Sequence, residues 1–192
     1  MAGQIVSWSM GAPPTWGSWF PRTGVEAAGG VAVDLADGPL AQARVREAVV
    51  AVDSDLLPEV PLLTVAVWVP QRETGEVVAA MVAELVVGVP PGPDPVAELV
   101  RGAARAPRRR GERTLEYSVA PGELPAGPAS IQTRTWADWG SRLVRTAITW
   151  TVVAPGASEA VVVEFSTTTP GMYDGLVDQS VTTMGTLMLE IA

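Results

Sequence analysis

Hydrophobic and polar positions alternate most regularly in the C-terminal part of the chain. Within residues 143–153, Ile148 and Trp150 stand on either side of Thr149, and a period of two with β-branched and aromatic residues is typical of a β-strand. Residues 159–168 alternate in the same way, after a short connection whose Pro-Gly pair favours a turn. The pattern therefore predicts an antiparallel hairpin.

An amphipathic helix is predicted directly after this hairpin. Thr169 and Pro170 are residue types that favour a helix N-cap and first helical position. Beyond them, apolar residues recur every three or four positions, as on one face of a helix. These residues are Tyr173, Leu176, Val177, Val181, Met184, Leu187 and Met188. We expect the helix to reach Met188 and to cover one face of the sheet that contains the hairpin.

The remaining elements follow from the same two periods. Apolar stripes of helical spacing, each introduced by Asp and Pro, predict helices at residues 39–53 and 95–105. Strands are predicted at residues 4–10, 62–69, 77–87, 114–119 and 131–137. Loops are predicted at residues 11–21 and 120–129, and the Gly/Ala-rich residues 24–38 permit only a short strand at residues 31–33.

This order of elements predicts one α+β domain over residues 1–192. Because consecutive strands are joined by short turns, the sheet should be mostly antiparallel. We expect a single sheet of about six to seven strands covered by three helices, since one sheet buries its apolar faces against helices.

Composition and charge narrow the class of protein. With 47% hydrophobic and 18% charged residues, the chain should fold as a globular domain. A net charge of −8 argues against nucleic-acid binding, which needs a basic surface. The first residues lack the charged and apolar regions of a secretory signal. The longest apolar run, residues 77–83, is far shorter than the ~20 residues that span a bilayer. We therefore expect a cytoplasmic protein without membrane insertion.

Several residue types needed for common catalytic sites are absent from the chain. It has no cysteine, histidine or lysine, and its 13 basic residues are all arginine. Thiol nucleophiles, Ser-His-Asp triads and phosphate-binding lysine loops are therefore excluded. An enzyme that uses only carboxylates, hydroxyls and arginine stays open. The acidic residues are scattered singly, however, and Glu84 is expected to face solvent or a sheet edge. We predict a non-catalytic protein without a cofactor or metal.

Two stretches are candidates for binding. Trp16, Trp19 and Phe20 lie in the predicted loop at residues 11–21, where they either anchor the chain end in the core or form an exposed aromatic surface. A cluster of six of the 13 arginines suits an anionic contact, or is a solvated loop that protects a sheet edge. These arginines are Arg101, Arg105, Arg108, Arg109, Arg110 and Arg113.

The order of elements resembles a known fold group. A first strand enters Pro14-Thr15-Trp16, and the final hairpin leads through residues 165–170 into a terminal helix. This arrangement resembles the PsbP-like α/β/α sandwich, a group that includes Lpq-type lipoproteins and Eag-type secretion chaperones. The resemblance covers nearly the whole chain, and residues 161–189 are its most specific part. Unlike the lipoproteins, this chain has no lipidation cysteine.

Members of this group mostly bind other proteins and are not catalysts. The resemblance therefore implies a cytoplasmic adaptor or chaperone-like module that binds another protein, such as a secreted effector of a bacterial secretion system. The alternative is a small-molecule or lipid-binding protein with an apolar pocket between sheet and helices.

Overall fold

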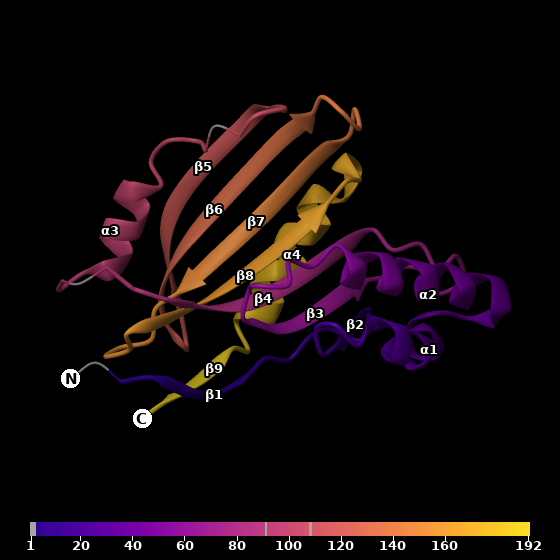
Figure 1. Ribbon diagram of the computed structural model, residues 1–192, viewed down its shortest axis with the longest axis horizontal. Helices are drawn as coiled ribbons and strands as arrows, with labels where there is room; N and C mark the ends of the chain where they lie inside the picture. Colours follow the sequence, from indigo (N-terminus) through magenta and orange to yellow (C-terminus); the bar gives the residue numbers. More distant parts are fainter. Residues whose placement is uncertain (1–2, 91, 108) are drawn as a thin grey trace.

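A seven-stranded antiparallel sheet forms the centre of the computed structural model, which describes residues 3–90, 92–107 and 109–192 (Figure 1). Its strand order is β2-β3-β4-β8-β7-β6-β5. The strands are β2 (Trp16–Trp19), β3 (Leu62–Trp68), β4 (Ala79–Val87), β5 (Glu112–Leu124), β6 (Gly127–Asp138), β7 (Val144–Val152) and β8 (Glu159–Thr167). The predicted α+β class and antiparallel sheet are confirmed. In these ranges the chain has four α-helices rather than three, and a second sheet of two strands.

The C-terminal hairpin forms as predicted. Strands β7 and β8 pair in antiparallel register, with Ile148 opposite Phe165 and Trp150 opposite Val163. All four side chains are buried, so this face of the hairpin is core. The opposite sides of the same strands carry the polar residues of the alternating pattern.

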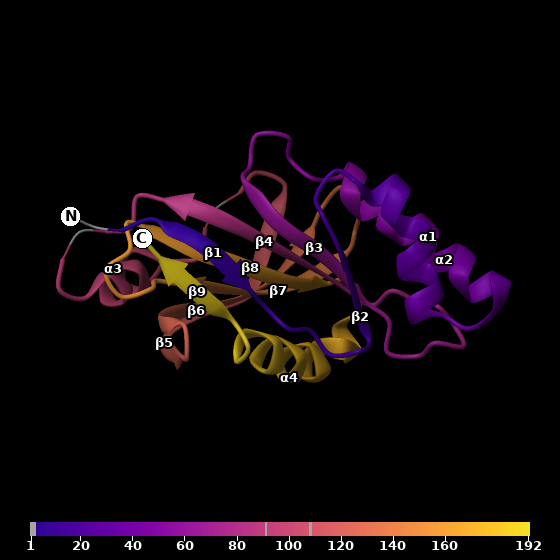
Figure 2. The ribbon, with the colours of Figure 1, turned by 90° about the horizontal axis from the view of Figure 1, so that it is seen from below.

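Helix α4 (Tyr173–Met184) follows a 3₁₀ turn, η1 (Pro170–Met172), and covers the core face of the sheet (Figure 2). Leu176 and Met184 are fully buried there. They belong to the same core as an aromatic group in which the ring of Trp16 stacks on Trp68 at 6.1 Å and meets Phe165 edge-on at 5.8 Å. The predicted amphipathic helix is therefore confirmed.

The end of this helix was predicted wrongly. The helix stops at Met184, and β9 (Met188–Ile191) then pairs with β1 (Ile5–Ser9) to form the second sheet. Leu187 fits the helical pattern because it is buried, but Met188 is 65% exposed. Residues 188–191 instead satisfy their backbone groups with the N-terminal strand, a partner far away in the sequence.

Helices α1 (Gly24–Leu35) and α2 (Gly38–Ser54) cover the other face of the sheet at its β2-β3 end (Figure 2). The strand suggested at residues 31–33 is wrong: Val31, Ala32 and Leu35 are buried on one side of α1. The 11–21 loop prediction also missed β2. Gly17 of β2 lies under α1, where a Cβ atom would approach Val31 and Leu35 to 2.7 Å.

Two further boundaries differ from prediction. Helix α3 (Pro95–Gly102) begins as expected, with the Asp94 carboxylate accepting a hydrogen bond from Ala97 N at 2.9 Å, but it ends before Arg105. The loop predicted at residues 120–129 is instead the end of β5 and the start of β6, joined by a tight turn. Pro121 is accommodated because β5 is an edge strand, where a missing N–H need not break the ladder.

One side of the sheet lies open between the helices. Helices α1 and α2 cover β2 and β3, and α3 packs near the far ends of β5 and β6. Between α2 and α3, the described helices leave strands β4, β8, β7, β6 and β5 uncovered on the side opposite α4 (Figure 1). This surface is called the open face below.

Candidate functional site

Cross-strand register determines which side chains form the open face, because paired residues in an antiparallel sheet point to the same side. Glu164 pairs with Thr149 on one neighbour and with Val82 on the other, and Thr149 pairs with Gln132. The central members of the open face are Val82, Glu84, Val162, Glu164, Ser166, Arg145, Ala147, Thr149, Gln132, Arg134, Trp136 and Tyr117. The face is thus mainly polar and contains charges of both signs.

Two carboxylates lie near each other on this face. Glu84 and Glu164 are on the adjacent strands β4 and β8, two positions apart in register. Burial raises the pKa of the Glu84 carboxyl. Burial also raises the pKa of Glu164, because protein groups surround its side chain even though part of that side chain contacts solvent. The charge of Arg109 lowers the pKa of Glu164, and the charge of Glu84 raises it. Glu84 is therefore half-buried on an interior strand, not at a sheet edge.

A buried ion pair lies on the β6-β5 side of the open face. Arg134 Nη2 donates to Glu112 Oε2 at 2.6 Å, and the two side chains are only 7% and 18% exposed. The guanidinium also lies over the indole of Trp136, 4.7 Å from the ring centroid. Its Nε atom is buried and has no partner within the described residues. The alternating pattern of residues 131–137 indicated a strand but not this pair.

Tyr117 connects the open face to α3. Its hydroxyl donates a hydrogen bond to the carbonyl of Ala103, the C-cap residue directly after α3. Burial raises the pKa of the Tyr117 hydroxyl, and the charge of Arg134 lowers it. This bond holds the arginine-rich segment after α3 close to β5.

A cavity of about 240 Å³ lies where the open face meets α2. Its walls include Val52 of α2, Trp136, Arg145, Glu164 and Ser166. Ligand sites for small molecules usually measure about 300–1,000 Å³, so this cavity is small. Over residues 3–90, 92–107 and 109–192, no three carboxylates come together in a way that could hold a metal ion.

The three predicted aromatic residues have different environments. Trp16 and Trp19 are 7% and 5% exposed in β2, where their indole nitrogens donate to Gln179 Oε1 at 3.0 Å and to Asp53 Oδ1 at 2.9 Å. Phe20 follows β2 and is 78% exposed. Of this trio, the structure presents only Phe20 at the surface.

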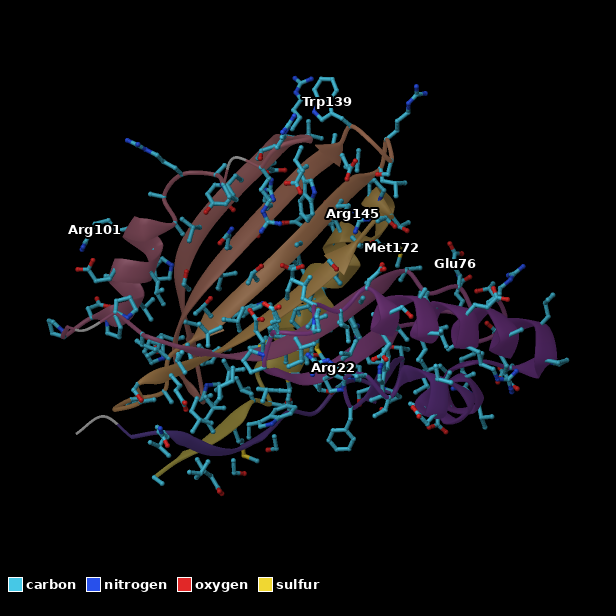
Figure 3. The ribbon with its side chains drawn as sticks, viewed as in Figure 1. Arg22, Glu76, Arg101, Trp139, Arg145 and Met172 are labelled. Carbon is cyan, nitrogen blue, oxygen red and sulfur yellow. The ribbon has the colours of Figure 1, made fainter. Side chains whose placement is uncertain are left out.

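The predicted arginines also separate into groups. Arg101 projects from α3 and pairs with Glu98 at 2.5 Å (Figure 3). Arg105 and Arg109 are exposed and line a pocket with Glu112 and Thr114. Arg110 is exposed beside them. Arg108, another predicted residue, lies outside the described residues.

Sequence reasoning missed one exposed aromatic residue, Trp139, in the turn between β6 and β7. The Asp138 carboxylate accepts hydrogen bonds from Gly140 N at 2.7 Å and Ser141 N at 3.0 Å, and Trp139 N donates to Gly111 O at 3.0 Å. The Trp139 indole is 70% exposed and projects beyond the end of the sheet (Figure 3). The Asp-Trp-Gly sequence between two strands was the available signal.

Comparison with known proteins finds a similar fold among solved structures but no match among sequences. No protein-family model and no curated protein matches the sequence. The α+β arrangement is LpqN-like: it is similar to a solved structure described as LpqN, involved in cell envelope biogenesis of Mycobacterium tuberculosis. The TM-score is 0.52 at 12% identity, over 95% of this chain and 83% of that one. This likeness establishes the fold alone. In the described part of the chain, every helix is too short or too polar to span a bilayer.

Proposed function

We propose that this chain is a non-catalytic protein-binding module, of the adaptor or chaperone-like type, that holds its partner against the open face. The observation that supports this proposal is the uncovered sheet surface between α2 and α3, with its two carboxylates of raised pKa. An antiparallel sheet can simply face water on one side. The charge of Glu84 disfavours the charged form of Glu164 on the next strand, however, and such local costs are typical of functional sites.

The setting of this function is inferred from the fold. LpqN is described as involved in cell envelope biogenesis, and we propose a related envelope role for this chain. The resemblance of this chain to the PsbP-like group, which includes the Eag-type secretion chaperones, suggests a secreted effector as the bound protein. The lack of cysteine, histidine and lysine supports a binding function over catalysis.

The alternative, a ligand pocket between sheet and helices, receives less support from the packing. On the α4 side, large side chains such as Phe165 and Leu176 are fully buried. On the α1-α2 side, Leu35, Val45 and Val49 pack against the valines of β3. At these positions both interfaces are filled by the protein's own side chains.

A pair of matched variants tests the proposal. Thr149→Arg places a bulky cation at the centre of the open face, and Thr182→Arg makes the same change on the exposed side of α4. In quantitative affinity capture from the native host, proteins that the wild type retains should be lost with Thr149→Arg and kept with Thr182→Arg. Equal retention by both variants, with melting temperatures matched, would refute binding at the open face.

A further inference from the structure

The β6-β7 end of the sheet presents a second surface, separate from the open face. It consists of Trp139 with Arg110, Arg113 and Arg142, and is called the Arg-Trp end here. We propose that the Arg-Trp end docks an acidic surface of the protein partner, with the Trp139 indole inserted into an apolar depression of that partner. This inference rests on the proposed binding function and specifies the chemistry of the partner.

The backbone around Trp139 is fixed before any partner arrives. Asp138 binds the amides of Gly140 and Ser141, and Arg142 N donates to Asp138 O at 2.9 Å. The bond from Trp139 N to Gly111 O ties this turn to the segment that begins β5. An exposed tryptophan on a pinned turn loses little conformational freedom on binding, so its apolar area is available for affinity.

The same bond brings a second arginine-bearing segment next to the turn that carries Trp139. Arg110 precedes Gly111, and Arg142 lies in the turn itself. Arg113 pairs with Ala137, two residues before Trp139. All three arginine side chains are exposed. Tryptophan and arginine are, with tyrosine, the residue types most enriched at interaction hot spots, and here they lie on neighbouring segments.

The two carboxylates nearest this turn, those of Glu112 and Asp138, are bonded to other groups. Glu112 is bound to the buried Arg134, and Asp138 accepts hydrogen bonds from the amides of its own turn, which hold its pKa below the usual range. Among the described residues, Arg110, Arg113 and Arg142 form no salt bridge. The Arg-Trp end is thus a positive surface on a chain of net charge −8, and its electrostatic complement is acidic.

A protein partner is favoured over a nucleic acid. The overall negative charge repels a phosphate backbone at longer range, and the positive surface is confined to one end. A compact positive patch around one aromatic anchor matches the anatomy of a protein interface, with an apolar centre and a charged rim. The rim charges then favour fast association and selection of acidic partners.

The test uses a defined probe, a fluorescein-labelled peptide of alternating glutamate and leucine, with fluorescence anisotropy as the readout. Trp139→Ala and the double variant Arg110→Glu/Arg142→Glu should each weaken binding by tenfold or more. The matched controls are Leu40→Ala, an exposed apolar side chain on α2, and Arg46→Glu, an exposed arginine on the same helix. Both controls should stay within twofold of the wild type.

Three outcomes would overturn the inference. They are no binding of the peptide by the wild type, equal weakening in controls and test variants, and tighter binding of a single-stranded oligonucleotide than of the peptide. Thermal unfolding of each variant should match the wild type, because the substituted side chains are exposed. If the peptide fails while Thr149→Arg still abolishes partner capture, only the docking of an acidic surface is refuted and the open-face function stands.

Discussion

Asp53, at the end of α2, accepts a hydrogen bond at 2.9 Å from the indole nitrogen of Trp19 in β2. The same carboxylate also accepts bonds from Arg22 N at 2.8 Å and Gly24 N at 3.0 Å. Gly24 is the first residue of α1, whose own N-cap residue, Thr23, makes no side-chain capping bond. One carboxylate on α2 therefore satisfies donors on β2 and at the start of α1.

Asp53→Ala should lower the free energy of unfolding by about 2–3 kcal/mol. The substitution leaves the nearly buried Trp19 indole without its acceptor, and hydrogen bonds to charged groups contribute about 1.5–3 kcal/mol. Urea denaturation measures the change. Asp55→Ala, two residues further on and exposed, is the matched control and should shift stability by less than about 0.5 kcal/mol. Equal effects from the two variants would refute the role assigned to Asp53.

The same carboxylate predicts a pH dependence at acid pH. Burial raises the pKa of Asp53, but hydrogen bonds from Trp19, Gly24 and Arg22 outweigh burial and hold it below 3.8. A lowered folded pKa means that this contribution to stability is complete above 3.8 and is lost as the pH falls through the folded value. Asp53→Asn should therefore lose less stability than the wild type when unfolding is followed from pH 5 down. Parallel curves for the two proteins would contradict this assignment.

Gly17→Ala should destabilise the contact between β2 and α1 by about 1–3 kcal/mol, the usual cost of overpacking. The new methyl group would lie 2.7 Å from Val31 Cγ1 and Leu35 Cδ1. Gly30→Ala is the matched control on α1, because a Cβ there meets no atom within 4 Å. In a helix interior that change should stabilise by about 0.5–1 kcal/mol. Differential scanning calorimetry should show shifts of opposite sign.

The success of the sequence predictions depended on how locally each element is determined. The β7-β8 hairpin was predictable because its alternation and its turn lie within one stretch. Helix α1 was missed because glycine and alanine give no clear period, and its stripe is defined by contact with the valines of β3. Strand β9 was missed because its partner, β1, lies at the other end of the chain.

The candidate site was less predictable than the fold. Glu84 lies near Glu164 because β4 pairs with β8, and these two strands are not hairpin partners. Arg134 lies near Glu112 because of the directions that the two side chains take. The arginine cluster was visible from the sequence, because six of the 13 arginines lie within residues 101–113. Its relation to Trp139 was not, because a backbone bond to Gly111 brings the two segments together.

Glu164→Gln should stabilise the protein at neutral pH, by at most about 1 kcal/mol after allowing for screening by solvent. Burial raises the pKa of Glu164, so its charged form disfavours folding above the ordinary value of 4.5. As the pH falls through the raised folded pKa, protonation relieves this cost, and the advantage of the variant should shrink toward pH 4.5. Urea denaturation at pH 7 and pH 4.5 measures both values. A variant less stable than the wild type at pH 7 would show that the Thr149 and Arg109 interactions outweigh burial.

Glu112→Gln should be the most destabilising of these changes, at about 3 kcal/mol or more, because it leaves the guanidinium of Arg134 buried without a counter-charge. Glu116→Gln is the matched control, since Glu116 is exposed on the same strand and should change stability by less than about 0.5 kcal/mol. A double variant, Glu112→Gln/Arg134→Met, distinguishes a lost ion pair from lost packing. If desolvation of Arg134 is the cause, removing both charges should recover much of the lost stability. If urea denaturation instead shows that the losses from the two substitutions add, Arg134 contributes mainly through its stacking on Trp136.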